Sequence, residues 1–313
     1  MKAQAAVSIV LGSALALVAC GPTSRDDGNG PGPGHGPDAG PSGGSDGGPT
    51  GEARRCNKMD IVFVVDDSGS MSEEQGNLAT NFPMFASVLQ NYVNADGEHI
   101  DFRVAVTTTG KTISYSVSGA PFPFTETGDN GAFRNNCNVN KRWLEPTDPN
   151  LGQTLGCRAN VGTSGPGYEM PLLVTKLALD DRMSDGTNTG FLRPDALLGI
   201  VMLTDEDDSS TLLSSFTISI ANPNPPVDYH PADLIAFLDG LKGHRSRWAA
   251  GVIAGETACT SAFGDATAAT RLKDFVTQAG TQAVFSSICA GDLTTALSEV
   301  IAKFQAACGD IIL

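Results

Sequence analysis

The sequence predicts an α/β domain over residues 56–313, built on a doubly wound, mainly parallel sheet with one antiparallel edge strand. Strand-like apolar runs alternate with helix-like segments, and the links between them are mostly short, as in parallel α/β sheets. The runs at 61–65 and 196–204 are almost wholly apolar, as expected for central strands that helices cover on both faces. The domain shows no second linker and no internal repeat, so we expect one structural unit.

The first 55 residues are predicted to lie outside that domain. Residues 1–19 have a positive start and an apolar stretch too short to span a bilayer, which is typical of a signal peptide. They lead into Leu-Val-Ala-Cys at 17–20, which resembles a bacterial lipobox and implies cleavage before Cys20 and its lipidation. The alternative is an ordinary signal peptide in which Cys20 has no role. Residues 20–55 are dominated by Gly, Pro, Ser and Asp, which predicts a disordered tether.

The elements of the domain can be assigned in order from local patterns. The first strand, 61–65, leads into a helix that begins near Ser72, where Gln75 three residues later completes a capping box. The alternating segment 112–117 is predicted to return antiparallel at the sheet edge, and the aperiodic segment 119–165 to form a long loop. The other predicted strands are 101–107, 196–204, 248–254 and 283–288, and the other predicted helices are 168–179, one from residue 231, 266–279 and 293–304.

The cysteines predict disulfides. Seven is an odd number for an exported chain, but six remain when Cys20 is reserved for lipid. Six cysteines allow fifteen pairings, so the sequence alone leaves the connectivity open. Their places along the domain favour Cys56–Cys308 between its ends, Cys137–Cys157 across the long loop and Cys259–Cys289 between two late segments. A zinc site is the alternative, but the domain has no CxxC or CxxH pair and little histidine.

The charge of the chain limits its partners. The formal net charge of −15 lies almost wholly in the predicted domain, which argues against binding to nucleic acid or to anionic lipid. We therefore expect membrane contact only through the lipid on Cys20, at the bacterial cell envelope. An Asp directly after the lipidated Cys is associated with retention at the inner membrane in many bacteria. Gly21 stands at that position here, which favours the outer membrane, and the sequence does not choose between the two faces of that membrane.

The motif Asp66-x-Ser68-x-Ser70 places one carboxylate and two hydroxyls directly after the first strand. Ligand sites of open α/β sheets lie at the carboxyl ends of strands, and these hard oxygens suit Mg²⁺, Ca²⁺ or Mn²⁺. With the helix that follows, the motif resembles the metal-ion-dependent adhesion site of the von Willebrand factor A domain family. The resemblance covers most of 60–305 and implies a Rossmann-like fold. The alternative is a capped turn in which both serines only satisfy backbone amides.

An adhesion site of this family takes its ligands from three loops. The resemblance implies a Thr from a loop before a helix, which we assign to Thr163 with the threonines at 107–109 as rivals. It also implies an Asp at the end of a later strand, which we assign to Asp205. In the family, the hydroxyls bind the cation directly and it accepts a carboxylate from a partner protein. The expected function is therefore a lipid-anchored, metal-dependent protein-binding module, with Mg²⁺ the first choice and Ca²⁺ or Mn²⁺ the alternatives.

Two other functions are compatible with parts of the sequence. A structural envelope protein with an unused metal site is one of them. A metal-dependent hydrolase is the less favoured one, and we expect no enzyme. Residues 66–68 resemble the phosphatase motif Asp-x-Asp-x-Thr of haloacid-dehalogenase-like enzymes, but Ser68 replaces the required second Asp. No histidine of the domain lies in a motif that marks a catalytic base.

Three further segments leave alternatives open. The acidic run at 206–208 is either a solvated loop or a second, Ca²⁺-like set of oxygens. The segments 119–162 and 209–229 exceed a minimal domain of the family. They either shape the partner surface or are neutral insertions.

Overall fold

The computed structural model describes residues 56–94, 96–261, 264–290 and 293–311. The predicted signal peptide, Cys20 and the tether up to residue 55 lie outside these residues, so they stay predictions. Within the described ranges, no helix is both long and apolar enough to cross a bilayer.

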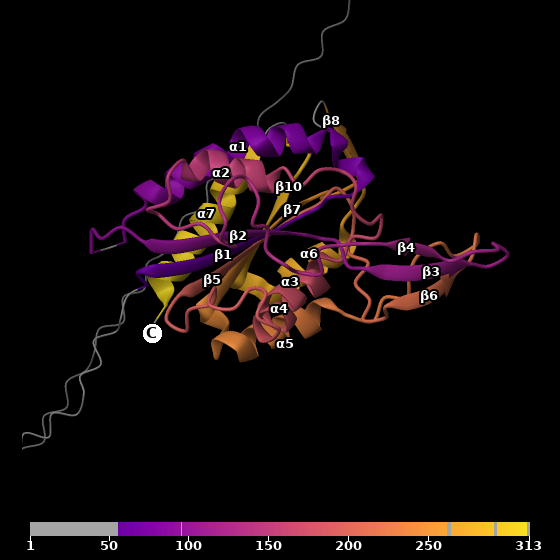
Figure 1. Ribbon diagram of the computed structural model, residues 1–313. Helices are drawn as coiled ribbons and strands as arrows, with labels where there is room; N and C mark the ends of the chain where they lie inside the picture. The colour runs from indigo at the N-terminus through magenta and orange to yellow at the C-terminus, as the bar shows by residue number, and fades with distance from the viewer. Residues whose placement is uncertain (1–55, 95, 262–263, 291–292, 312–313) are drawn as a thin grey trace, which may run out of the picture. The chain divides into compact units, whose positions relative to one another are not determined.

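Five parallel strands form the central sheet, which confirms the predicted doubly wound α/β class (Figure 1). Their order is β10-β7-β5-β1-β2, so β1 pairs with β2 on one side and with β5 on the other. The chain thus leaves β1 toward one edge of the sheet and later continues toward the other. Ligands of such sheets bind at this switch point, beyond the carboxyl ends of the strands. The strands are β1 Lys58–Val65, β2 Asp101–Thr108, β5 Leu197–Leu203, β7 Trp248–Ala254 and β10 Ala283–Ser287.

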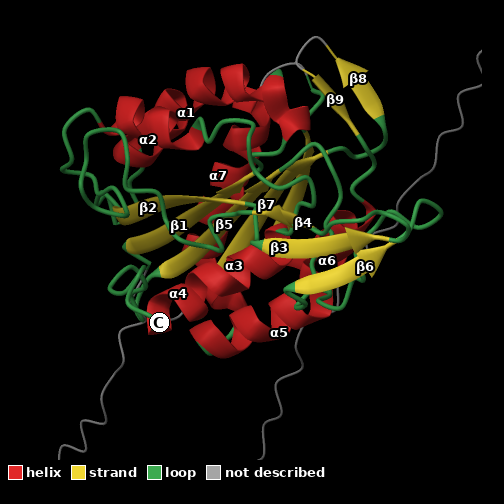
Figure 2. Cartoon of the chain, turned by 45° about the vertical axis from the view of Figure 1, so that its right-hand side comes forward, coloured by secondary structure: helices red, strands yellow, loops and turns green. Residues whose placement is uncertain are grey.

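Helices cover both faces of this sheet (Figures 1 and 2). Alternate side chains of β1 enter opposite core layers: Phe63 packs with one helical layer and Val64 with the other. This arrangement explains the unbroken apolar run at 61–65. One layer contains α1 Glu74–Asn91, α2 Leu151–Ala159 and α7 Leu293–Asp310, and the other contains α3 Pro171–Leu179, α4 Asp181–Ser184, α5 Pro231–Lys242 and α6 Thr270–Ala279; the short 3₁₀ turns are η1 Gly69–Ser72, η2 Arg245–Arg247 and η3 Gly280–Gln282.

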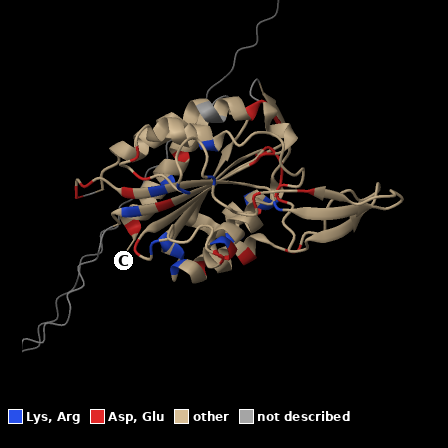
Figure 3. Ribbon diagram, viewed as in Figure 1, with Lys and Arg blue, Asp and Glu red and all other residues tan. Residues whose placement is uncertain are grey.

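The predicted antiparallel edge strand does not belong to the central sheet. It is β3 (Ile113–Val117), which pairs antiparallel with β4 (Phe124–Glu126) and parallel with β6 (Ser215–Ile218) in a separate three-stranded sheet, called the arm here. Tyr115 explains the difference, because its ring stacks on Phe124 and Phe216 at centroid distances of 5.4 and 5.8 Å. Few Lys, Arg, Asp or Glu residues lie on the arm, which projects beyond the central sheet (Figure 3).

The segment 119–165, predicted as a loop, also contains regular structure. Besides β4 it holds α2, which packs against α1 in the first core layer. Leu144 lies beside the edge strand β2 and exchanges two backbone hydrogen bonds with Val104, of 2.8 and 2.9 Å. Part of this long segment therefore covers the free edge of the sheet, which helps protect it from pairing with other chains.

All three favoured disulfide pairings are present. Cys56–Cys308 joins the two ends of the domain, Cys137–Cys157 lies within the long segment and joins its irregular part to α2, and Cys259–Cys289 joins a small hairpin to the segment after β10. The hairpin consists of β8 (Cys259–Ser261) and β9 (Gly264–Ala266). The late helix predicted over 266–279 begins only at residue 270. Its expected first residues belong instead to β9 and to the connection after that strand.

Candidate metal site

Hydrogen bonds from neighbouring loops hold Asp66 in place in the candidate site. Its amide donates to the Leu203 carbonyl at 2.9 Å, which continues the pairing of β1 with β5 by one residue. The Ser68 amide donates to Asp66 Oδ1 (2.8 Å), and the Thr204 hydroxyl donates to Asp66 Oδ2 (2.6 Å). Both carboxylate oxygens of this buried side chain are thus oriented by the two loops that follow β1 and β5.

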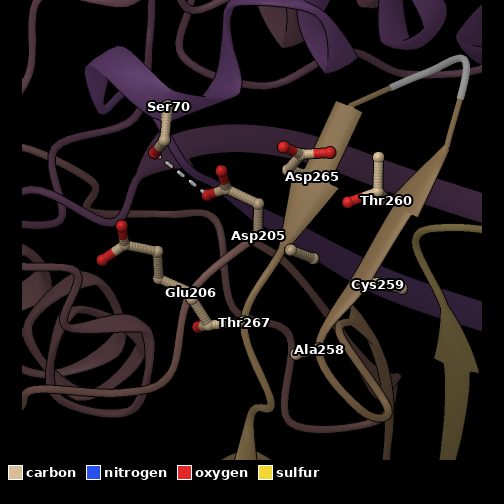
Figure 4. A pocket seen from close by; sticks show the side chains of 9 residues that line it. Ser70, Asp205, Glu206, Ala258, Cys259, Thr260, Asp265 and Thr267 are labelled. Atoms are coloured by element: carbon tan, nitrogen blue, oxygen red, sulfur yellow. Dashed lines mark hydrogen bonds between the residues drawn. The ribbon is translucent and has the colours of Figure 1, made fainter.

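The two serine hydroxyls connect the first loop to Asp205. Ser68 Oγ and Ser70 Oγ lie 2.8 Å apart, and the Ser70 hydroxyl donates to Asp205 Oδ1 at 3.2 Å (Figure 4). Ser68 is the residue before η1, yet its side chain makes no capping hydrogen bond. The capped-turn alternative therefore has no support from Ser68. The structure brings four of the five predicted ligands together, namely Asp66, Ser68, Ser70 and Asp205.

Thr163 is the predicted ligand that the structure does not link to the other four. Its side chain is exposed, and no hydrogen bond joins it to them within the described ranges. Its assignment therefore stays a prediction. Among its rivals, Thr107 is buried at the end of β2 and its hydroxyl has no partner among the described residues.

Glu169 is a buried carboxyl group near Asp66 that the sequence reasoning missed. It lies two residues before α3 and is 1% exposed, and its Oε1 has no hydrogen-bond partner among the described residues. A signal was present in the sequence, because Pro171 suits the first position of a helix and would leave Glu169 outside that helix. The helix was instead predicted to begin at residue 168, which hid Glu169 inside it.

Negative charge is concentrated in this part of the fold. Burial, and then the Asp66 carboxylate, raise the pKa of Asp205 to about 7. Burial also raises the pKa of Asp66 itself, and burial together with the charges of Asp66 and Glu206 raises the pKa of Glu169 well above its ordinary range. The neighbouring charges that act on these three groups are those of other carboxylates. A divalent cation would relieve this repulsion, which fits the donor set.

The donors are of mixed type. In the described part of the chain, no three Asp, Glu, His or Cys side chains are grouped closely enough to hold a metal ion by themselves. A cation held by Asp66 and Asp205 would therefore need further donors, and the hydroxyls of Ser68 and Ser70 lie beside these carboxylates. These hydroxyls and carboxylates are hard oxygen donors, which suit Mg²⁺, Ca²⁺ or Mn²⁺.

A pocket of about 480 Å³ opens beside the site. Ser70 and Asp205 lie on one side of it, and Thr260 and Asp265 of the β8–β9 hairpin lie across from them (Figure 4). Cys259, which also lines the pocket, is bonded to Cys289. The pocket gives an incoming group from another molecule a route to Ser70, whose side chain is exposed.

The acidic run after Asp205 has structural partners. Asp207 accepts hydrogen bonds from the Arg271 amide (3.0 Å) and the Thr270 hydroxyl (2.7 Å) at the start of α6. Asp208 is buried and accepts from the Leu172 amide (3.0 Å) in the first turn of α3. Both carboxylates act as favourable negative charges at helix N-termini. The alternative of a second Ca²⁺ site at Asp207 and Asp208 gains no support from this arrangement.

Comparisons with known proteins show resemblances of structure only. No protein-family model matches the chain, and no curated protein matches it. Proximal thread matrix protein 1 from the mussel byssus aligns with 80% of this chain and 49% of its own, at 13% identity and a TM-score of 0.43. The manganese-loaded TRAP protein of Plasmodium vivax aligns over 82% and 76%, at 9% identity and a TM-score of 0.39. The pilus adhesin SpaC from Lactobacillus rhamnosus GG aligns over 82% and 31%, at 10% identity and a TM-score of 0.41.

This chain thus spans about half the length of the mussel protein and less than a third of the adhesin. The strand order and the loop contacts described above, rather than these distant alignments, define the fold and the candidate site.

Proposed function

We propose that this domain binds a divalent cation through Asp66, Ser68, Ser70 and Asp205, and uses it to hold a partner protein. The observation that carries the proposal is the connected set of hydrogen bonds from Asp66 through both serines to Asp205 at the switch point of the sheet. Mg²⁺ is the first choice of cation, with Ca²⁺ and Mn²⁺ as alternatives.

The cation would supply the positive charge to which a partner carboxylate binds. The chain's own residues define how that happens. The Thr204 hydroxyl and the Ser68 amide orient the Asp66 carboxylate, and the neutral serine hydroxyls add donors without adding charge. The pocket beside Ser70 and Asp205 leaves one side of the site accessible. Together these features favour binding of an external carboxylate over a buried, closed ion.

The same proposal places the domain at the bacterial envelope, held by a lipid on Cys20 and a tether to residue 55. The acidic domain would stay clear of anionic lipid, so the partner would be a protein rather than the membrane surface. Binding rather than catalysis is proposed, because Ser68 stands where a phosphoaspartate mechanism needs its second carboxylate.

Capture from envelope extracts tests the proposal. The full chain in detergent is immobilised, and the extract is applied in Mg²⁺ and then in EDTA, with Ser68→Ala as the matched variant. We expect a protein that is retained in Mg²⁺, released by EDTA and not retained by Ser68→Ala. A partner that remains bound in EDTA would favour the structural alternative, and turnover of a phosphoester would favour the hydrolase.

A further inference from the structure

The strand β6 has a free edge. In the arm, β6 pairs with β3 on one side, and no strand of the described residues lies on its other side. The Ser118 amide of the β3 side donates to the Ile218 carbonyl at 2.8 Å, so Ile218 faces β3. Because alternate residues of a strand bond toward opposite sides, the amides and carbonyls of Ser215 and Thr217 face outward. These groups are available to bond to another strand.

Two other sheet edges of the fold carry protection that β6 lacks. The segment at Leu144 covers the edge of β2. Pro121 and Pro123 precede or adjoin β4, which ends at Glu126. Proline, charge and covering segments are the usual means by which proteins keep a strand edge from pairing. The run 209–222, which contains β6, has no proline and no charged residue.

The arm is the uncharged part of an acidic chain. The formal net charge is −15, so two copies of the chain repel one another over most of their surface. The segments 112–125 and 209–227 contain β3, β6 and most of β4, and they have no Lys, Arg, Asp or Glu (Figure 3). Two copies can therefore approach arm to arm without bringing like charges together.

Exposed apolar side chains are concentrated in the same two segments. Leu212 and Ile220 are 59% and 90% exposed, and they lie four positions before and four positions after Phe216 of β6. They are thus placed symmetrically about this strand. A group of exposed apolar side chains is typical of a protein-binding surface. The exposed large apolar residues of the two segments are Phe122, Phe124, Leu212, Leu213 and Ile220.

We propose that two copies of this chain associate through antiparallel pairing of their β6 strands. Pairing centred on Phe216 sets Ser215 of each copy against Thr217 of the other, so the outward backbone groups of both strands gain partners. The same register directs Leu212 of each copy toward Ile220 of the other. The contact uses the same surface on both copies, as a two-fold axis requires, and it joins the two arms into one continuous sheet. This inference is independent of the proposed cation site.

Sedimentation equilibrium of the full chain, in density-matched detergent with EDTA, tests the inference. Thr217→Lys replaces an exposed side chain and adds a charge to the free edge, which is how natural edge strands avoid pairing. Thr125→Lys is the matched control, because Thr125 is an exposed residue of β4 on the opposite side of the arm sheet. We expect the wild type and Thr125→Lys to form dimers, and Thr217→Lys to have a dimer dissociation constant at least about tenfold higher.

Three results would overturn the inference. They are a wild type that is monomeric at all concentrations, a dimer that Thr217→Lys does not weaken, and an equal weakening by both lysine variants. Should Thr217→Lys not fold, Ser215→Lys adds the charge at the other outward-facing residue of β6, whose side chain is also exposed. An unchanged dimer in that variant overturns the inference as well. Because EDTA removes divalent cations, failure of the cation site would leave these results unchanged.

Discussion

The Ser70 hydroxyl donates a 3.2 Å hydrogen bond to Asp205 Oδ1, and this contact joins the loop after β1 to the loop after β5. The two residues are far apart in the sequence, but parallel pairing of β1 with β5 brings both strand ends to one edge of the sheet. The hydroxyl thus lies between two carboxylate-bearing loops, next to Ser68 Oγ at 2.8 Å.

Ser68→Ala should weaken cation binding with little loss of stability. The substitution removes one oxygen donor and one hydroxyl–hydroxyl contact, so we expect a loss of about 0.5–1.5 kcal/mol in the free energy of unfolding in EDTA. The affinity for Mn²⁺ should fall at least about tenfold, or about 1.4 kcal/mol. Calorimetric titration and urea unfolding measure the two effects separately. Equal Mn²⁺ affinities in variant and wild type would remove Ser68 from the ligand set.

Stability without metal should decrease as the pH rises. Because the pKa of Asp205 is raised to about 7, the folded chain holds more protons than the unfolded chain between the ordinary value of 3.8 and about 7. The free energy of unfolding therefore falls with rising pH in that window. In EDTA, we expect the Tm to fall from about pH 5 to about pH 7.5, and to fall less in Asp205→Asn. Identical slopes in the two proteins would contradict the burial argument.

Cation affinity should depend on pH in the opposite direction. Protons compete with the cation for the carboxylates of Asp66 and Asp205, whose pKa values are both raised by burial. Affinity for Mn²⁺ should therefore increase as the pH rises toward about 7, because fewer protons must be displaced. Titrations at several pH values measure this slope. A constant affinity across the range would mean that these carboxylates do not bind the ion.

The disulfide between the ends of the domain should contribute strongly to stability. Cys56–Cys308 closes a loop with a sequence separation of 252 residues, which constrains the unfolded chain. Replacing both residues by Ala should lower the free energy of unfolding by about 2–5 kcal/mol in urea. The Mn²⁺ affinity of the folded variant should not change, because neither residue lies in the candidate site. A change below 1 kcal/mol would show that the ends are held by packing alone.

Gly251→Ala should destabilise the core between β7 and α7. A Cβ atom at residue 251 would lie 2.2 Å from Cγ2 of Val300, a contact too short to be tolerated without movement of the helix. Overpacking of this kind costs about 1–3 kcal/mol. Urea unfolding measures the loss, and Gly240→Ala is the control because a Cβ there meets nothing within 4 Å. If both variants have the same free energy of unfolding, α7 moves to accommodate the added methyl group without a measurable loss of stability.

The central sheet could be predicted because its signals are local. The run at 61–65 is apolar because Phe63 and Val64 enter opposite core layers, and an unbroken apolar run of this kind is visible in the sequence. The arm could not be predicted from local patterns. β3 pairs with β6 about one hundred residues later, and the stacking of Tyr115 on Phe216 that selects this partner leaves no periodic signal.

The candidate site also has a part that local sequence patterns predict and a part that they do not. Asp66, Ser68 and Ser70 form a contiguous motif, and Asp205 directly follows a strand end, so parallel pairing places them together. The burial of Glu169 near these residues depends instead on where α3 begins, which only the folded chain specifies.

Binding of Mn²⁺ to the full chain, followed by electron paramagnetic resonance, tests the central claim most directly. Free Mn²⁺ gives a signal that decreases when the ion is bound, so the stoichiometry can be counted. We expect one bound ion per wild-type chain and none in Asp66→Asn at the same concentration. Asp66→Asn keeps the size of the side chain but removes its charge. Absence of binding in the wild type, or the same stoichiometry and affinity in Asp66→Asn, would contradict a cation site at the end of β1.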